Sequence, residues 1–224
     1  MTMRYEWAFL KNCDKKRAMA NTKRQHQPSI EFVSETALPT AGVVLNVRAY
    51  RSSNGTEPLA IYTELPSHGP VPLRIHDACF TSEVLGSIKC DCKAQLDFAL
   101  EYIQQHGGLI IYLHQEGRGI GLANKIAAYA LQEQGLDTVE ANRALHLPDD
   151  ARQYDDAANI LKELGIQSVA LLTNNPRKAT ALKDLGISVM KRLPIFCKVS
   201  DRAQTYLDTK ILKMGHYPMP QDND

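Results

Sequence analysis

The 224-residue sequence has no run of about 18 apolar residues, and its N-terminal stretch carries charged residues where a secretory signal has an apolar core. We therefore expect neither a membrane span nor a signal peptide, and we expect a cytoplasmic protein. The sequence also lacks a strong charge of one sign, since its formal net charge is +1. A general nucleic-acid-binding protein needs a basic excess, so we expect no nucleic-acid partner.

Cysteines are few: there are five, an odd number, and three of them lie between positions 79 and 92. This pattern fits metal ligation in a reducing compartment better than a disulfide framework. Hydrophobic residues make up 44% of the chain and charged residues 23%, which is typical of a globular domain.

Cys79 and the pair Cys90-Asp-Cys92 offer three thiolates. Zn²⁺ takes four ligands, so three cysteines leave one position for water or substrate, which favours catalysis over a purely structural role. If this segment is a strand, Cys90 and Cys92 point to the same face, and Cys79 joins them from a preceding loop. The alternative is three buried cysteines with no metal.

The hydrophobic pattern predicts a single α/β domain with a mixed β-sheet flanked by helices. Residues 30–73 read as antiparallel strands with hairpin turns, after which strands and helices alternate. The predicted helices span 94–105, 120–134, 157–164 and 176–185, and the predicted strands include 43–47, 59–62, 109–113, 169–172 and 187–192.

We expect three parts: a basic N-terminal extension (1–29), a catalytic domain (30–216) and a C-terminal tail (217–224). The extension holds seven Lys and Arg against Glu6 and Asp14, with a predicted helix over 5–19. Residues 206–216 are a further candidate helix. Charge runs are usually solvated, so an RNA or membrane contact is the weaker interpretation of the extension.

Two polar turns precede predicted helices. In His114-Gln-Glu-Gly-Arg-Gly-Ile-Gly121, glycines allow backbone N–H groups to approach an anion, while Glu116 and Arg118 suit a guanine edge and a phosphate. A salt bridge within the loop is the alternative. In the second turn, Thr173 and Lys178 flank Pro176, which can begin a helix whose N-terminus favours phosphate. The alternative is an ordinary N-cap by Asn174 or Asn175.

Asp150 and Arg152 lie two positions apart, so the carboxylate can act as a base or hold the arginine in one pose. Alone this pair is a weak signal. Together with the cysteine trio and the two turns, it suggests metal-assisted hydrolysis of a nucleotide.

The ordered motifs closely resemble GTP cyclohydrolase II, the first enzyme of riboflavin synthesis, over roughly residues 30–216. The resemblance rests on Arg74-Ile-His, Cys79, Cys90-Asp-Cys92, Gln95, Gln115-Glu-Gly-Arg-Gly-Ile-Gly-Leu, Asn124-Lys125, Tyr129-Ala-Leu-Gln, Asp137-Thr-Val-Glu-Ala-Asn142, Asp150-x-Arg152-x-Tyr154, Leu172-Thr-Asn-Asn-Pro176, Tyr206-Leu-x-Thr-Lys and Met214-Gly-His216.

The resemblance implies a Zn²⁺ on Cys79, Cys90 and Cys92 that activates water against C8 of the guanine ring of GTP. Formate and pyrophosphate would be released, leaving a diaminopyrimidinone nucleotide, with Mg²⁺ accompanying the triphosphate and a homodimer as the usual assembly. Arg152 would be a nucleophile at the α-phosphorus with Asp150 as its base. Because a guanidinium stays protonated, charge stabilisation by Arg152 is an equally physical role.

Other roles follow by position in the same family. Tyr129 would be a further catalytic residue. Substrate contacts would come from Arg74, Ile75, His76, Asp77, Ala78, Gln95, Glu116, Gly117, Arg118, Thr138, Thr173 and Lys178.

The metal loop departs from the usual family pattern. Asp77-Ala78 stands where Ser-Glu is usual, Phe80-Thr-Ser-Glu83 replaces Leu-Thr-Gly-Asp, and Lys93 replaces a glycine. Groups around metal ligands tune the metal. Two alternatives therefore stay open: a diverged relative that acts on another nucleotide or pyrimidine compound or releases only pyrophosphate, and a zinc-stabilised nucleotide- or RNA-binding module.

Overall fold

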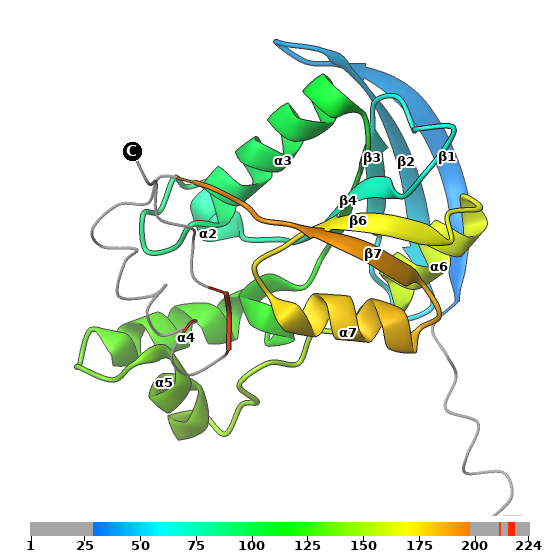
Figure 1. Cartoon of the computed structure of the whole chain (residues 1–224). Coiled ribbons are helices and arrows are strands. Elements are labelled where there is room, and N and C mark those ends of the chain that lie inside the picture. The colour runs from blue at the N-terminus through cyan, green and yellow to red at the C-terminus, as the bar shows by residue number, and fades with distance from the viewer. Residues whose placement is uncertain (1–28, 198–210, 212–214, 218–224) are drawn as a thin grey trace, which may run out of the picture.

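The computed structural model describes residues 29–197, 211 and 215–217. Figure 1 shows one curved sheet with helices packed around it. In chain order the elements are β1 (Ile30–Pro39), β2 (Val44–Ser52), β3 (Leu59–Tyr62), β4 (Val71–Asp77), α2 (Phe80–Glu83), α3 (Cys92–His106), β5 (Leu109–Leu113), the 3₁₀ helix η1 (Glu116–Gly119), α4 (Leu122–Gln132), α5 (Thr138–Ala144), α6 (Asp155–Glu163), β6 (Ser168–Leu172), α7 (Pro176–Asp184) and β7 (Ser188–Leu193).

The seven strands form a mixed sheet in the order β1-β2-β3-β5-β4-β6-β7. β1, β2, β3 and β5 are antiparallel neighbours, whereas β5, β4, β6 and β7 pair in parallel. The prediction of a mixed α/β fold is confirmed. The prediction of antiparallel pairing is correct for β1 to β3 and wrong for β4, because β4 is followed by the crossover helix α3 and so returns in parallel.

Side chains of β5 alternate between two hydrophobic clusters. Leu109 and Ile111 are fully buried in a large cluster with residues of α6 and α7, such as Ile160 and Leu182. Ile110 points the other way, into a smaller cluster with Ala99 and Ile103 of α3. Period-two alternation thus buries both faces of this central strand, as expected for the parallel part of a sheet.

The helices lie close to their predicted positions, with one omission. α3, α4, α6 and α7 overlap the predicted helices, but α5 was not predicted. A capping box begins α5: Asp137 accepts from the backbone of Val139 and Glu140, and Glu140 accepts from the Asp137 amide. This D-x-x-E signal is visible in the sequence.

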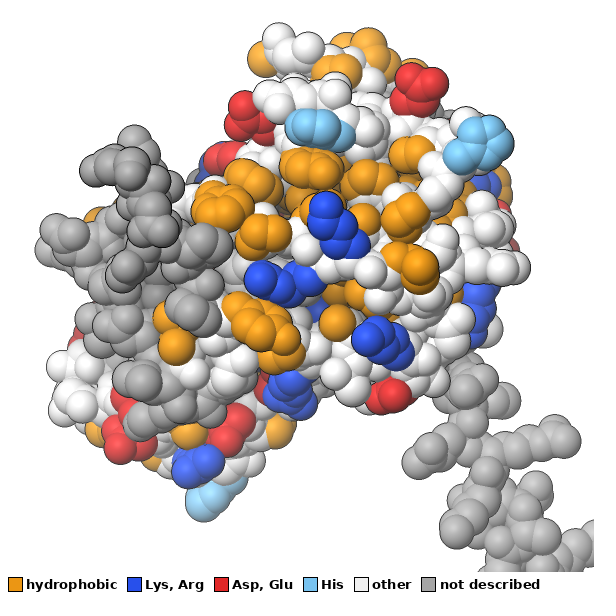
Figure 2. All heavy atoms as spheres, in the orientation of Figure 1, with side chains coloured by type: hydrophobic (Ala, Val, Ile, Leu, Met, Phe, Trp, Pro, Cys, Tyr) orange, Lys and Arg blue, Asp and Glu red, His pale blue; other side chains and the backbone are white. Residues whose placement is uncertain are grey.

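Among the described residues, no helix is both long enough and apolar enough to cross a membrane. Figure 2 shows Lys and Arg side chains lying separately among apolar and uncharged ones on the face in view. The helix predicted over 5–19 lies outside the described residues, as does most of 206–216.

Candidate active site and metal centre

A cleft lies where the parallel strands β4, β5 and β6 end, with an empty volume of about 1010 Å³ including its part open to solvent. Open α/β sheets bind ligands at the carboxyl ends of their strands. Of the predicted site residues, the cleft is lined by Arg74, His76, Asp77, Ala78, Cys79, Cys90, Cys92, Gln95, Glu116, Gly117, Arg118, Tyr129, Thr138, Arg152, Thr173 and Lys178. Ile75 instead belongs to the hydrophobic core, and Asp150 lies behind Arg152.

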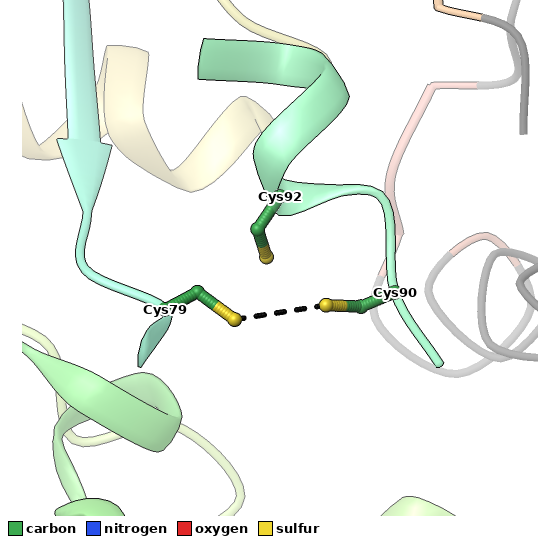
Figure 3. A group of neighbouring side chains, drawn as sticks. All are labelled: Cys79, Cys90 and Cys92. Atoms are coloured by element: carbon green, nitrogen blue, oxygen red, sulfur yellow. Dashed lines mark hydrogen bonds between the residues drawn. The ribbon is translucent and has the colours of Figure 1, made fainter. Parts of the chain in front are cut away.

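The three cysteines converge, with sulfur atoms within 4.8 Å of one another (Figure 3). Cys79 lies two residues after the end of β4, Cys90 lies in the turn before α3, and Cys92 is the first residue of α3. The segment around Cys90 and Cys92 is not the strand considered as one possibility: the chain turns there before α3, and both sulfur atoms lie near that of Cys79.

The trio's chemistry fits a soft or borderline metal ion. Hydrogen bonds with the Cys90 and Cys92 thiols, followed by Lys125, hold the pKa of Cys79 well below its usual range, although burial opposes this. The thiolate is the form that ligates metal. Three thiolates suit Zn²⁺ and leave one of its four positions for water or substrate.

A partly buried carboxylate, that of Glu83, holds the loop that carries Cys79. Glu83 Oε1 accepts from the Cys79 amide at 2.8 Å and lies 3.0 Å from His76 Nε2, while Oε2 accepts from the Tyr112 hydroxyl at 2.7 Å. Burial alone would raise the pKa of Glu83, but hydrogen bonds from His76 and Tyr112 lower it. In the sequence, Glu83 stands out only as a departure from the family pattern in the metal loop, and no role for it follows from the sequence alone.

The glycine turn at η1 has a backbone that few residues adopt. Gly117 and Arg118 both have positive φ, 62° and 61°, so two consecutive left-handed residues reverse the chain. A Cβ on Gly119 would lie 3.0 Å from the Ala151 carbonyl carbon, and the Ala151 amide donates to the Arg118 carbonyl at 3.0 Å. The turn therefore packs directly on the loop that carries Asp150 and Arg152.

Glu116 pairs with Lys125, a residue to which sequence analysis gave no role. The Lys125 Nζ lies 2.7 Å from Glu116 Oε1 and 3.0 Å from Cys79 Sγ. Burial would lower the pKa of Lys125, but the bonds to Cys79 and Glu116 raise it above its usual value. Lys125 and Cys79 are 46 positions apart in the sequence, so only the folded structure brings them into contact.

An ionic network forms the other end of the cleft. Asp150 holds Arg152 through two bonds, Nε to Oδ1 at 2.9 Å and Nη2 to Oδ2 at 2.8 Å. Arg152 Nη1 also donates to Asp77 Oδ2 at 2.8 Å. Lys178 Nζ lies 2.8 Å from the same Asp77 oxygen and 2.8 Å from the Ile75 carbonyl. Of the two roles considered for Asp150, base or holder of the arginine, these bonds fit the second.

Burial and charge oppose each other in this network. Burial raises the pKa of Asp77, but Lys178 and Arg152 outweigh it and bring the value to about 2. Burial likewise lowers the pKa of Lys178 to about 7 against the opposing effect of Asp77. For Arg152, the carboxylates overcome burial and raise the pKa further. Arg152 is therefore a fixed cation.

The end of β4 presents polar atoms without partners among the described residues: Arg74 Nε, His76 Nδ1 and Asp77 Oδ1. Arg74 also donates to Gln95 Oε1 at 2.7 Å and to the Leu172 carbonyl at 3.3 Å. Burial lowers the pKa of His76, so its ring is neutral, and donation from Nε2 to Glu83 leaves Nδ1 as an acceptor. Buried polar atoms normally have partners, so these three are suited to a polar ligand.

The remaining predicted residues border the cleft. The Tyr129 ring has Lys89 Nζ 4.8 Å and Lys125 Nζ 5.7 Å from its centroid. Thr138 begins α5 at the rim. Thr173 is buried, and its hydroxyl accepts from the Asn175 amide, while Asn175 caps α7 by accepting from the Arg177 amide. The N-cap interpretation is thus confirmed for Asn175.

Comparison with known proteins identifies the same family that the motifs resemble. A family model described as GTP cyclohydrolase II matches residues 31–194. A protein named GTP cyclohydrolase-2 from Neisseria gonorrhoeae is 49% identical over 189 residues, covering 84% of this chain and 96% of that protein. GTP cyclohydrolase-2 from Picrophilus torridus is 44% identical, covering 84% of this chain and 98% of that protein.

A longer relative matches in part. The Riboflavin biosynthesis protein RibBA of Thermotoga maritima is 50% identical over 184 residues, which are 82% of this chain and 47% of that protein. The chain thus spans about half of this relative and nearly all of the two shorter ones. With the cysteine trio, the ionic network and the matched residues 31–194 in place, the chain belongs to the GTP cyclohydrolase II family.

Proposed function

We propose that this protein opens the imidazole ring of GTP at C8 with zinc bound, releasing formate and pyrophosphate in the first step of riboflavin synthesis. The observation that carries the proposal is the meeting, in one cleft, of three convergent cysteines and an ionic network built on the fixed cation Arg152. Thiolates suit a catalytic metal, and guanidinium and ammonium groups suit phosphate.

At the metal end, Cys79, Cys90 and Cys92 would hold Zn²⁺, which supplies the acid strength that activates water near neutral pH. Glu83 accepts a hydrogen bond from the Cys79 backbone amide and so helps to position this ligand. Tyr129 lies beside this end of the cleft, next to the ammonium of Lys125. We assign Tyr129 to proton transfer near the opening ring.

For the guanine base, Arg74, His76 and Gln95 are proposed to make the contacts. Arg74 Nε is a donor, and Nδ1 of neutral His76 is an acceptor. A purine edge offers both kinds of partner, and a site that leaves buried polar atoms unpaired rejects ligands that cannot satisfy them. Glu116 and Arg118 complete the substrate contacts from the η1 turn.

At the ionic end, Arg152 is proposed to stabilise the negative charge that develops on the phosphates as the bond between the α-phosphorus and the bridging oxygen of pyrophosphate breaks. Carboxylates hold its guanidinium from both sides, and its pKa is raised, so it keeps its proton. These contacts favour charge stabilisation over nucleophilic attack. Lys178 and Thr173 would face the phosphates, and Mg²⁺ would accompany the triphosphate, because phosphate oxygens are its preferred ligands.

We further propose that the protein is a homodimer whose catalytic unit runs from residue 30 to 216. The test of the proposed function is formate release from GTP by purified protein reconstituted with Zn²⁺ and Mg²⁺. Formate in step with loss of GTP is the expected result. Zinc-loaded protein that leaves GTP intact, or releases pyrophosphate alone, would contradict it.

A further inference from the structure

Lys125 joins the metal loop to the substrate turn. Its ammonium lies 3.0 Å from Cys79 Sγ and 2.7 Å from Glu116 Oε1. The second oxygen of Glu116 accepts from the backbone amide of Phe80, the residue after Cys79, at 2.6 Å. The contacts thus form a closed circuit from the Cys79 sulfur through Lys125 and Glu116 back to the Cys79 loop.

The circuit is largely shielded from water. The side chains of Lys125 and Glu116 are 11% and 13% exposed, so their charges are screened less than surface charges. Three thiolates and one Zn²⁺ sum to a charge of −1, and the Glu116 carboxylate adds another negative charge nearby. The ammonium of Lys125 offsets this excess at the sulfur atom itself.

We propose that Lys125 is a positioning residue of the metal site, which holds the Cys79 sulfur in its ligating pose and sets the affinity for zinc. The inference rests on the zinc site of the proposed function. Outer partners of metal ligands typically change metal affinity by about 10–100-fold. Lys125 donates its hydrogen bond to the ligating sulfur atom, so it acts on the ligand that binds the metal.

The test is zinc affinity, measured without GTP by competition with a chromophoric chelator on the purified full chain. We expect K125M to raise the zinc dissociation constant by about 10–100-fold. K125R keeps a cation and is expected to retain most of the affinity. The matched control is K93M, because Lys93 follows Cys92 directly but its ammonium pairs with Asp97 at 2.7 Å and is half exposed. K93M should change the zinc dissociation constant by no more than about twofold, because surface ion pairs contribute little.

K125M has two effects: it removes the hydrogen bond to the Cys79 sulfur, and it leaves the Glu116 carboxylate without its ion-pair partner. A second variant distinguishes between them. K125M/E116Q removes both charges together and should bind zinc as weakly as K125M, whereas E116Q alone keeps the lysine on the sulfur and should lose less affinity than K125M does. Full affinity in K125M, or recovery of affinity in the double variant, would overturn the inference.

Cobalt substitution gives a readout at the sulfur itself. In Co²⁺-loaded protein, the sulfur-to-metal charge-transfer band should move in K125M and stay in place in K93M, because only K125M removes a hydrogen bond to a ligand. An unmoved band in K125M would also overturn the inference. Failure of the unaltered protein to bind zinc at all would contradict the proposed function instead.

Discussion

The two ends of the cleft are built in different ways. The metal end comes from one short segment, residues 79–92, whose three sulfur atoms converge within 4.8 Å. The ionic end comes from distant segments, since the Arg152–Asp77 bond spans 75 positions and the Lys178–Ile75 bond spans 103. At the metal end the Cys79 sulfur contacts Cys90 and Lys125, whereas at the ionic end Arg152 and Lys178 share the carboxylate of Asp77.

Because the two ends are built differently, a substitution is expected to have different consequences at each. A thiolate removed from the metal end takes with it a ligand that nothing else supplies. A charge removed from the ionic end leaves a buried partner unpaired, so stability suffers along with chemistry. The predictions below separate the two ends by product and by stability.

The largest effect is expected from C90S. Loss of one ligand removes metal catalysis, worth several kcal/mol, so formate release should fall by about 10³-fold or more. Pyrophosphate release should fall much less, because the ionic end is intact. The measurement is both products from the same reaction, with bound zinc counted. The control is C197S, which removes a thiol outside the trio and should leave the zinc content unchanged. Equal losses of formate and pyrophosphate in C90S would show that the two ends of the cleft do not act separately.

R152M is expected to act on the opposite product. Removing one fixed donor to a developing charge typically costs about 10²–10³ in rate, so pyrophosphate release should fall by that factor while zinc content stays constant. R152K keeps the charge without the planar fork and should recover part of the rate if Arg152 stabilises charge. If R152K releases pyrophosphate no faster than R152M, the nucleophile interpretation is favoured.

D77N tests stability at the ionic end. Removing one partner of a buried ion pair typically costs about 3–5 kcal/mol, so we expect the free energy of unfolding at pH 7 to fall by that amount. The folded pKa of Asp77 is about 2, below the ordinary 3.8. Its charged form therefore stabilises the fold above pH 3.8, and this contribution is lost as the pH falls toward 2.

Urea unfolding of both proteins across this pH range is the measurement. The gap between D77N and the unaltered protein should narrow as the pH falls. The control is D97N, which breaks an exposed pair and should cost about 0.5 kcal/mol or less. A gap that stays constant with pH would show that Asp77 is not charged in the folded protein.

The smallest effect is expected far from the cleft. The Tyr50 hydroxyl donates to Glu163 Oε2 at 2.8 Å, tying β2 to α6. Y50F should lower the free energy of unfolding by about 1 kcal/mol and leave both products unchanged. A loss of either product in Y50F would show that the contact between β2 and α6 is coupled to the cleft.

Local signals account for what the sequence predicts correctly. Cysteine spacing pointed to the metal end because its ligands lie within one segment, and the apolar run of β5 marked a buried strand. The turn before α3 was missed because period-two spacing of Cys90 and Cys92 also fits a strand. The helix α5 carried a readable capping box at Asp137 and Glu140.

Long-range pairings are beyond local signals. Asp77 looked like one departure in the metal loop, yet it is the carboxylate that joins Arg152 to Lys178. The partners of Lys125 lie 46 and 9 positions away, and nothing in its own neighbourhood of sequence indicates the sulfur contact. Such roles appear only when the sheet brings β4, η1 and α4 together.

The most direct test of the account measures formate and pyrophosphate together from GTP and Mg²⁺, in zinc-stripped protein and again after zinc is restored. We expect formate release to be lost on stripping and to return with zinc, while pyrophosphate release continues throughout. Formate release that survives complete zinc removal, or pyrophosphate release that vanishes with the metal, would contradict a cleft with two separable ends.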